Sequence, residues 1–405
     1  MPTMPNRRPV PTQTTMGNRR RIITMLAIAL GGFGIGTTEF VAMGLLNLIA
    51  EDFQISESTA GHVISAYALG VVVGAPLITT LTSTVPRRRL ALVLMIAFTI
   101  GNGLTVLASS YNMLLLSRFI AGLPHGAYFS VTALIAASMA PPGQRGKAVA
   151  FSGLGLSVAT VAGVPAAQWL GTHFGWNFAF LLVAVIGLVT FVALYISLPH
   201  MTLMPKSNPI TELGALINPQ VLLTLAIGTV GFGGMFAVYT YISWTLTERA
   251  GFNEALMWIP LMAYGIGMVF GTWFGGVLAD RNLEYTIAGS LICLIVVLGA
   301  FYFTSTNAIT GIANFGLIGF LGSCLVPSLQ TRLMDVARDA QNLAAALNHS
   351  ALNMANAAGA AIGGAVIGAG FGYAAPAFAG AALAATGAVV WLLAFLLRRR
   401  QLAAA

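Results

Sequence analysis

Three ionisable side chains lie in or beside long apolar runs of this chain, where a charge is costly and therefore informative. Glu39 lies about midway along the apolar residues 22–50 and is the only acidic residue in the interior of any such run. Arg118 and His125 are seven residues apart, which in a helix means two turns, or about 10 Å along one face. Carboxyl, imidazole and guanidinium groups at membrane depth are typical of proton relays. The three residues therefore indicate proton movement through an apolar interior.

Each of the three residues also has a structural interpretation. Glu39 is alternatively a neutral, hydrogen-bonded carboxyl, and Arg118 alternatively extends to the nearer membrane interface. Apolar surroundings disfavour the charged form of a carboxyl, which suits a group that must bind and release a proton. We therefore expect Glu39 to carry the proton, with Arg118 and His125 tuning it.

The composition of the 405 residues indicates a polytopic membrane protein. Apolar residues make up 57 % and charged residues only 7 %, and the mean hydropathy is +0.85. A soluble chain carries about 25 % charged residues. This composition excludes secreted disulfide scaffolds, disordered regulators and ordinary cytosolic enzymes. Cys293 and Cys324 lie in apolar stretches, so buried thiols are expected rather than a disulfide.

The charged residues divide the chain into lengths that suit membrane-crossing helices, which need about 20 largely apolar residues. Some runs are long enough for one helix and others for two. Counted in this way, the runs predict an all-α protein of twelve transmembrane helices. The runs are residues 22–50, 58–86, 90–117, 119–144, 148–205 (two helices), 213–247, 255–279, 285–331 (two helices) and 340–397 (two helices).

The distribution of Lys and Arg predicts the orientation of these helices. With the N-terminus inside, 17 of the 19 basic residues fall on the inner side, so both termini should be cytoplasmic. The net charge of +8 therefore reflects topology rather than binding to nucleic acid. The inner residues are Arg7, Arg8, Arg19, Arg20, Arg21, Arg87, Arg88, Arg89, Arg145, Lys147, Lys206, Arg281, Arg332, Arg338, Arg398, Arg399 and Arg400.

An internal repeat divides the helices into two halves. Small residues recur at every fourth position in the fifth and eleventh helices, and Gly163 and Gly359 are equivalent positions in the two series. Two parallel halves with a binding site between them are a known transporter design. We expect a cytoplasmic tail (1–21), an N-terminal six-helix bundle (22–198), a cytoplasmic linker (199–220), a C-terminal six-helix bundle (221–397) and a cytoplasmic tail (398–405).

The loop after the eighth helix reads Gly276-x-Leu278-x-Asp280-Arg281 and resembles the loop signature of the major facilitator superfamily. In that signature the glycine allows close helix approach and the aspartate interacts with a neighbouring helix end. The loop after the second helix keeps the basic residues 87–89 but lacks the aspartate, so we interpret those residues as membrane anchors.

The fifth helix carries Gly155, Gly163, Pro165 and Gly171, a pattern that resembles the antiporter signature of the drug:proton antiporter branch of that superfamily. Small residues at this spacing let two helices approach closely, and Pro165 can bend the helix. The resemblance implies a contact that seals the transport cavity against proton leak. Helix packing without that role is the alternative.

The first helix contains Thr38-Glu39-Phe40 and Gly44-Leu45-Leu46, and resembles bacterial sugar- and arabinose-efflux permeases and chloramphenicol exporters. The likeness continues through residues 118–125. It implies the major facilitator fold, with two pseudo-symmetric six-helix bundles, and a place for Arg118 in proton relay. We expect a proton-coupled transporter of the bacterial inner membrane that exports small sugars or amphipathic drugs by alternating access. Uptake by symport is the alternative.

The second half offers candidates for contact with the substrate. Tyr239 and Tyr241 lie in the seventh helix, whereas His349, Asn353 and Asn356 share one face of the eleventh. For His349, a place at the membrane interface is the alternative to substrate contact. Trp244 near the end of the seventh helix is interpreted as an interface anchor.

The motifs of membrane-embedded enzymes and of channels are missing from the sequence. No helix holds a His-Glu-x-x-His or paired-aspartate motif, and no filter sequence is visible. We therefore expect no catalytic residue, metal or cofactor, because the proton gradient would drive transport. The expected partners are a small-molecule substrate, protons and the lipid bilayer, without nucleic acid, and the chain is expected to be a monomer.

Overall fold

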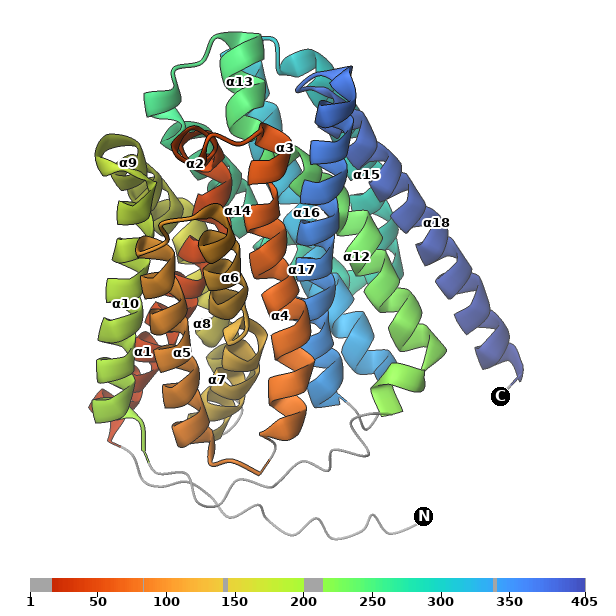
Figure 1. Ribbon diagram of the computed structural model, residues 1–405. Helices are drawn as coiled ribbons and strands as arrows, with labels where there is room; N and C mark the ends of the chain where they lie inside the picture. The colour runs from red at the N-terminus through yellow and green to blue at the C-terminus, as the bar shows by residue number, and fades with distance from the viewer. Residues whose placement is uncertain (1–16, 83, 141–144, 200–213, 338–340, 405) are drawn as a thin grey trace, which may run out of the picture.

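The computed structural model describes residues 17–82, 84–140, 145–199, 214–337 and 341–404, and every element in these ranges is helical (Figure 1). Twelve segments within them are long and apolar enough to cross a membrane, which confirms the predicted number. Most of the predicted N-terminal tail and of the predicted linker, and the last residue, lie outside the described residues. The boundaries given to the bundles therefore stay predictions.

The first six spans, called here the N-half, are formed by helices α1 to α10. Their bounds are α1 (Asn18–Gly44), α2 (Leu46–Phe53), α3 (Glu57–Ala60), α4 (His62–Leu81), α5 (Arg87–Val106), α6 (Tyr111–Gly122), α7 (His125–Met139), α8 (Arg145–Val158), α9 (Val164–Phe174) and α10 (Trp176–Ser197). A π-helical turn, Ala159–Gly163, joins α8 to α9 within the fifth span.

The last six spans, called here the C-half, are formed by helices α12 to α18. Their bounds are α12 (Pro219–Thr240), α13 (Ile242–Ala250), α14 (Trp258–Arg281), α15 (Leu283–Thr304), α16 (Ala308–Ala337), α17 (Gln341–Val366) and α18 (Ala375–Ala404). Short 3-10 turns cover Gly214–Ile217 and Glu254–Leu256, and a π-helical turn, Ile367–Phe371, ends the eleventh span.

The fourth span begins earlier than the charge pattern predicts. Ser110 caps α6 by accepting a hydrogen bond from the backbone N–H of Met113, at 3.3 Å, so the helix starts before Arg118. Arg118 therefore lies inside the span rather than at its edge. Leu123 and Pro124 join α6 to α7 with right-handed helical torsions, so Arg118 and His125 lie in consecutive helices of one span.

The small residues of the fifth span bring it against α1. A Cβ atom added at Gly155 would lie 1.8 Å from the Ala29 carbonyl oxygen, and one at Gly163 would lie 2.2 Å from Thr37 Oγ1. The close helix contact expected from the glycine spacing is therefore present. The corresponding stripe of the eleventh span packs on α12, where a Cβ at Gly359 would lie 2.4 Å from a backbone oxygen.

The π-helical turn lies between the two halves. On one side it meets α1 at Gly36, and on the other it meets α14, where a Cβ at Gly265 would lie 2.2 Å from the Thr160 carbonyl oxygen. The distortion ends directly before Pro165, which lies in the first turn of α9. The bend expected from the proline is thus realised as a widened turn that precedes it.

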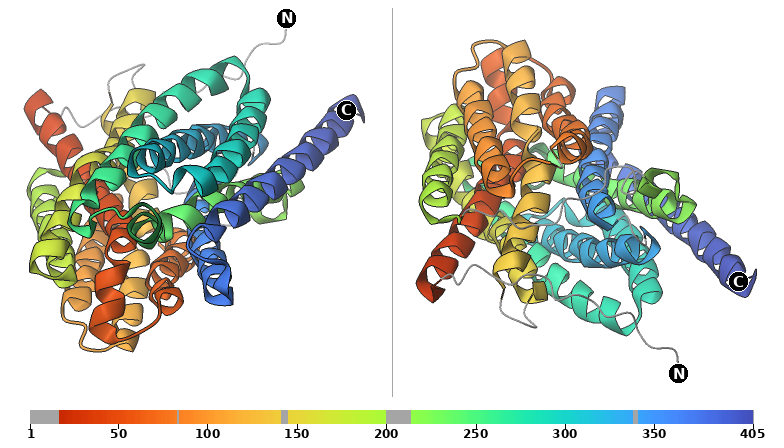
Figure 2. Two further views of the ribbon diagram at one scale, coloured as in Figure 1. Left: turned by 90° about the horizontal axis from the view of Figure 1, so that it is seen from above. Right: turned by 90° about the horizontal axis from the view of Figure 1, so that it is seen from below.

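The N-half and C-half lie side by side along two long contacts, α4 with α17 and the fifth span with α14 (Figures 1 and 2). Several contacts between the halves lie toward the end of the bundle where α2, α3 and α13 are found, at the top of Figure 1. Tyr373 donates to Glu57 at 3.3 Å, and Ser65 donates to the Ala357 carbonyl at 3.4 Å.

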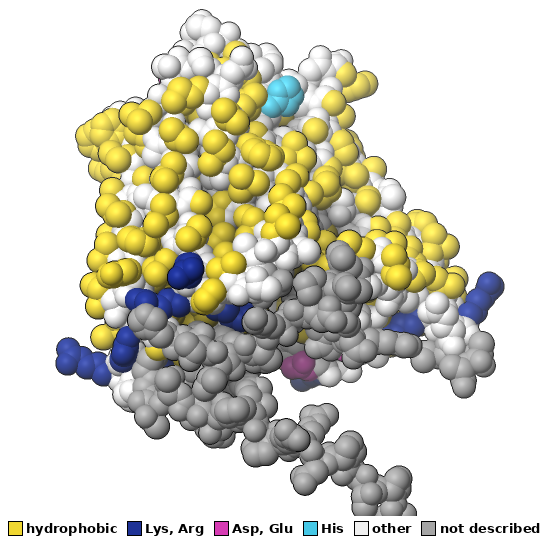
Figure 3. Space-filling model, turned by 60° about the horizontal axis from the view of Figure 1, so that its bottom comes forward, with side chains coloured by type: hydrophobic (Ala, Val, Ile, Leu, Met, Phe, Trp, Pro, Cys, Tyr) yellow, Lys and Arg dark blue, Asp and Glu magenta, His cyan; other side chains and the backbone are white. Residues whose placement is uncertain are grey.

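The outside of the molecule is predominantly apolar. Large hydrophobic side chains such as Ile309, Trp273 and Ile196 are exposed, as expected of a surface that faces lipid. In Figure 3 the apolar surface gives way to Lys and Arg side chains toward the lower end of the molecule. Both cysteines are free, and Cys324 is buried as expected, but Cys293 is exposed because it lies on this outer surface.

Arg332 departs from its predicted place in an inner loop. It lies within α16, is fully buried, and forms an ion pair with Glu284 of α15. Trp391 and Arg398 of α18 also donate to Glu284, at 2.9 and 3.4 Å. Arg332 therefore links helices within the C-half and is more than an indicator of membrane orientation. Trp244 is likewise buried, beside Tyr241, and is not an exposed anchor.

Candidate functional site

Arg118 forms a double hydrogen bond to the residue that precedes Glu39. Its two terminal nitrogens donate to the hydroxyl of Thr38 at 2.8 Å and to the Thr38 carbonyl at 2.9 Å. The Thr38 hydroxyl in turn donates to Asn102 of α5 at 2.6 Å. Since Arg118 is fully buried, its side chain does not extend to the membrane interface. The arginine thus fixes the backbone beside the acidic residue of the first span.

Two aromatic rings enclose the Arg118 guanidinium. Its central carbon lies 4.5 Å from the ring centre of Tyr67 on α4 and 4.9 Å from that of Phe180 on α10. The face of an aromatic ring attracts a cation, and this attraction is worth about 2 kcal/mol or more where water is excluded. Side chains from four spans therefore hold one positive charge in the interior of the N-half.

Tyr67 also contacts His125, which makes it the link between the two basic groups. Its hydroxyl and His125 Nδ1 are 3.0 Å apart and share a hydrogen bond. The sequence places Arg118 and His125 two helical turns apart, and the structure adds a connection between them through Tyr67 from another span. Tyr67 lies in an apolar run with no neighbouring polar pattern, so no local signal indicates its role.

Glu39 lies in the same interior but has a different environment. Its side chain is almost fully buried, and no hydrogen bond reaches its carboxyl from the residues that the structure describes. Arg118, Tyr67, Tyr239 and Tyr264 lie close enough to interact with it electrostatically. A carboxyl that has a nearby cation but no fixed hydrogen-bond partner is free to exchange a proton.

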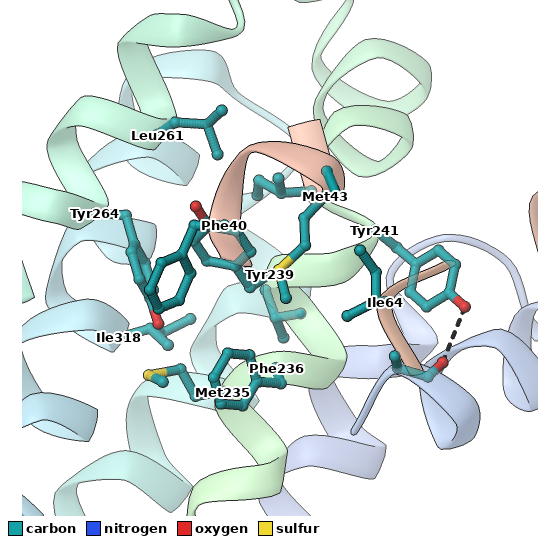
Figure 4. Packing of buried hydrophobic residues seen from close by; sticks show 14 of the residues in the cluster. Phe40, Met43, Ile64, Met235, Phe236, Tyr239, Tyr241, Leu261, Tyr264 and Ile318 are labelled. Atoms are coloured by element: carbon teal, nitrogen blue, oxygen red, sulfur yellow. Dashed lines mark hydrogen bonds between the residues drawn. The ribbon is translucent and has the colours of Figure 1, made fainter. Parts of the chain in front are cut away.

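Aromatic side chains of the C-half close over Phe40, the residue after Glu39 (Figure 4). The Phe40 ring stacks on Phe236 and meets Tyr239 edge to face, with ring centres 6.3 and 5.7 Å apart. Tyr239 in turn contacts Tyr264 at 4.4 Å. The Tyr264 hydroxyl is buried without a hydrogen-bond partner in the described part of the chain, so it remains available to a bound molecule.

The two tyrosines predicted to contact substrate have different surroundings. Tyr239 belongs to the aromatic group near Glu39. Tyr241 instead donates its hydroxyl to the Ala360 carbonyl of α17 at 2.9 Å, the bond drawn in Figure 4. The Tyr241 hydroxyl is therefore occupied within the protein, and its observed role is packing.

The polar face of α17 points toward the N-half. His349 stacks on Phe129, with ring centres 5.2 Å apart and planes within 3°, and its ring centre lies 5.9 Å from that of His125. This contact places His349 between the two halves rather than on the outer surface. The amide nitrogen of Asn353 donates to the His349 carbonyl at 3.1 Å.

Several amide atoms on this face are buried without partners. Asn353 Oδ1 and both polar side-chain atoms of Asn356 make no hydrogen bond to any residue described in the structure. An unpaired buried polar atom costs about 1–3 kcal/mol. These atoms and the Tyr264 hydroxyl are therefore buried polar atoms whose cost a hydrogen bond from a bound molecule would remove.

The two sequence signatures lie at different distances from this region. Gly155, Gly163 and Gly171 pack on α1, and Gly163 meets Thr37, two residues before Glu39. The loop signature lies at the far end of α14. Gly276 there has open space around it, so the close approach expected of this glycine is made instead by Gly275, against Cys324.

Asp280 and Arg281 complete the loop signature at the end of α14. Both are exposed, and neither makes a hydrogen bond or ion pair with the described residues. The predicted contact between Asp280 and a neighbouring helix end is therefore absent from the described structure.

Comparisons with known proteins agree with this architecture. Residues 28–340 match the sequence model of the Major Facilitator Superfamily. The inner membrane transport protein YdhP of Escherichia coli (strain K12) is 42 % identical over 377 residues, which cover 93 % of this chain and 96 % of that protein. A chloramphenicol resistance protein of Streptomyces lividans is 31 % identical over 348 residues, 85 % of this chain and 88 % of the relative.

A solved structure shares the fold at low sequence identity. The crystal structure of a bacterial homologue of the human lysosomal transporter Spinster, in an inward-facing and unoccupied conformation, superimposes with a TM-score of 0.74. It is 16 % identical in sequence, and the match covers 94 % of this chain and 98 % of that one. At this identity the likeness concerns the fold alone.

Proposed function

Because this chain belongs to the Major Facilitator Superfamily, we propose that it is a proton-coupled transporter that exports a small polar or amphipathic molecule by alternating access. The family and the transport proteins related to it make this chain a membrane transporter rather than an enzyme. Coupling to protons, the substrate and the direction of transport are the proposed parts.

The observation that carries the proposal is the buried Glu39 carboxyl beside an arginine that holds its backbone. When the carboxyl is protonated, the site carries only the Arg118 charge. When the proton leaves, the carboxylate is attracted to that guanidinium. Loss or gain of a proton therefore changes the net charge of the interior, and this change can favour one arrangement of the halves over the other.

His125 is proposed to tune this exchange through Tyr67. A proton on the imidazole would place a second positive charge near Arg118, because Tyr67 contacts both groups. His349 faces His125 from the C-half, so the protonation state of His125 also affects the contact between halves. This arrangement supports a role for His125 in coupling proton binding to rearrangement.

The proposed substrate contacts are the unpaired polar atoms of Asn353, Asn356 and Tyr264 and the nearby ring of Tyr239. Amide and hydroxyl groups beside aromatic rings suit a neutral molecule with both polar and apolar surface, such as a small sugar or an amphipathic drug. The name of the Streptomyces lividans relative, a chloramphenicol resistance protein, supports export of a drug-like molecule.

The proposed orientation places both termini in the cytoplasm, since the basic residues gather toward that end. The end at which Tyr373 contacts Glu57 would then face the periplasm. In this orientation the periplasmic ends of the halves are in contact. Uptake by symport would use the same residues, so the direction of coupled movement must be measured.

The proposal is tested with the purified protein in liposomes that contain a pH-sensitive dye. Addition of sugars and antibiotics, one at a time, should identify a compound whose movement is accompanied by proton movement in the opposite direction. Proton movement in the same direction would replace export with symport. Proton coupling would be refuted if an imposed pH gradient left the movement of the substrate unchanged.

A further inference from the structure

Two groups of three arginines lie on either side of the carboxyl end of α10. Arg20 Nε at the start of α1 donates to the Ser197 carbonyl at 2.9 Å. From the start of α5, Arg88 donates to the Tyr195 carbonyl at 2.8 Å, and its guanidinium lies 5.6 Å from the Tyr195 ring centre. The last turn of α10 thus brings the two groups together. The N-half arginine cluster consists of Arg19, Arg20, Arg21, Arg87, Arg88 and Arg89.

No carboxylate of the described N-half lies near this cluster. The acidic residues described there are Glu39, Glu51, Asp52 and Glu57, which lie in the middle of the first span or toward its opposite end. Arg19, Arg87 and Arg89 make no ion pair with any described residue. Arg19, Arg87 and Arg89 therefore lie at one helix end without a carboxylate of the described N-half to balance their charge.

The corresponding end of the C-half differs in this respect. Arg332 and Arg398 both pair with Glu284. Asp280 and Asp335 lie toward the same ends of α14 and α16. Described carboxylates therefore balance less of the positive charge at the N-half cluster than at the C-half end.

Exposed apolar side chains adjoin the cluster. On α1, Ile22, Ile23 and Leu26 follow the arginines directly. On α10, Val192 and Ile196 lie within the last two turns, beside Tyr195 and Ser197, whose carbonyls accept hydrogen bonds from Arg88 and Arg20. A ligand of this surface would therefore have an anionic group beside long apolar chains.

We propose that the N-half arginine cluster binds a phospholipid with a net negative headgroup. Guanidinium groups bind phosphate oxygens through paired hydrogen bonds, and the exposed side chains of α1 and α10 would contact the acyl chains. Clustered arginines at the end of membrane-crossing helices are a known basis for recognising anionic lipids. The proposal concerns lipid binding and does not depend on the transported substrate.

The test compares phosphatidylglycerol with phosphatidylcholine as lipids bound to the full-length protein, measured by native mass spectrometry from neutral detergent. Wild type should retain phosphatidylglycerol preferentially. The double variant Arg87→Gln/Arg89→Gln should weaken that binding by about tenfold, since each arginine near an anionic surface contributes substantially. The matched control Arg399→Gln/Arg400→Gln removes two exposed arginines from the C-half and should leave it unchanged.

Three results would overturn the proposal: equal retention of both lipids by wild type, equal loss in the two double variants, or displacement of phosphatidylglycerol by inorganic phosphate. The last result would indicate a site for free phosphate. Neither Arg87 nor Arg89 makes a side-chain hydrogen bond within the described chain, so the variant should fold. If its thermal unfolding differs from wild type, Arg19→Gln/Arg21→Gln replaces it, with the same expected loss.

Discussion

Arg118 donates hydrogen bonds to both the hydroxyl and the carbonyl oxygen of Thr38, a residue 80 positions away in the sequence. The pair joins the fourth span to the first at the residue directly before Glu39. Because the carbonyl belongs to the peptide unit that leads into Glu39, any displacement of the guanidinium also displaces the acidic residue. The geometry of this pair is therefore central to the proposed coupling.

Arg118→Lys should reduce coupled transport by about tenfold or more while the protein still folds. A lysine retains the charge but cannot donate in the planar fork that reaches both oxygens, and hydrogen bonds to charged groups contribute about 1.5–3 kcal/mol. Thr38→Ala is the graded control, because it removes the hydroxyl acceptor and leaves the carbonyl. It should have the smaller effect. Equal transport by Arg118→Lys and wild type in proteoliposomes would show that the paired bonds are dispensable.

Much of the fold could be predicted from the sequence because the bilayer requires about 20 apolar residues for each crossing. Charged residues do not mark the ends of helices where the charged side chain is buried. Arg332 was expected in an inner loop and Arg118 inside or at the edge of a span; both lie inside helices and are fully buried. Thr38, Tyr67 and Glu284 compensate their charges, and these partners lie far away in the sequence.

Only those residues of the site that are unusual in their own stretch of sequence could be predicted. Glu39 and Arg118 are conspicuous because ionisable groups are rare in apolar runs. Tyr67 and Tyr264 are ordinary aromatic residues in such runs, and their positions depend on how separate spans pack. Pro165 predicts a bend in the fifth span, but the contacts of the widened turn with α1 and α14 depend on how separate spans pack.

Gly155→Ala should destabilise the N-half and reduce transport. The added methyl group would lie 1.8 Å from the Ala29 carbonyl oxygen, which belongs to a helix backbone that cannot move independently. Overpacking of this kind costs about 1–3 kcal/mol. The thermal unfolding temperature in detergent measures the effect. Gly153→Ala, on the same helix with open space around it, is the matched control and should be as stable as wild type or slightly more stable.

Glu284→Gln should lower the free energy of unfolding by about 3–5 kcal/mol, because it leaves the buried Arg332 without its counter-charge. Arg398→Gln removes the more exposed partner of the same carboxylate and should cost less than about 1 kcal/mol. Chemical unfolding of both variants provides the comparison. Similar losses in the two variants would mean that the Arg332 pair does not stabilise the C-half.

Tyr373→Phe should weaken the contact between halves at the end where Tyr373 donates to Glu57. Burial, followed by the Glu57 charge, raises the pKa of Tyr373 above its ordinary value near 10, so the hydroxyl remains a donor throughout the neutral range. The tyrosine contribution should therefore be constant at neutral pH and disappear only as pH rises through the raised pKa. Loss of one hydrogen bond should shift the equilibrium between contacting and separated ends by about fivefold.

This shift is measured as the distance between two spin labels, one on α3 and one on the loop beside α13. Wild type should hold the ends together better than Tyr373→Phe at neutral pH and should lose this advantage in strong alkali, where the phenolate and the Glu57 carboxylate repel each other. An unchanged distance distribution in the variant would indicate that the bond does not hold the halves together.

The central claim, that Glu39 carries the coupled proton, is tested most directly by proton flux through Glu39→Gln in proteoliposomes. Glutamine retains the size of the side chain but cannot ionise. With a transported compound identified, the variant should still bind it and exchange it downhill, but it should release no proton and fail to transport against a gradient. Proton flux per molecule transported equal to that of wild type would contradict the account and leave His125 as the remaining candidate.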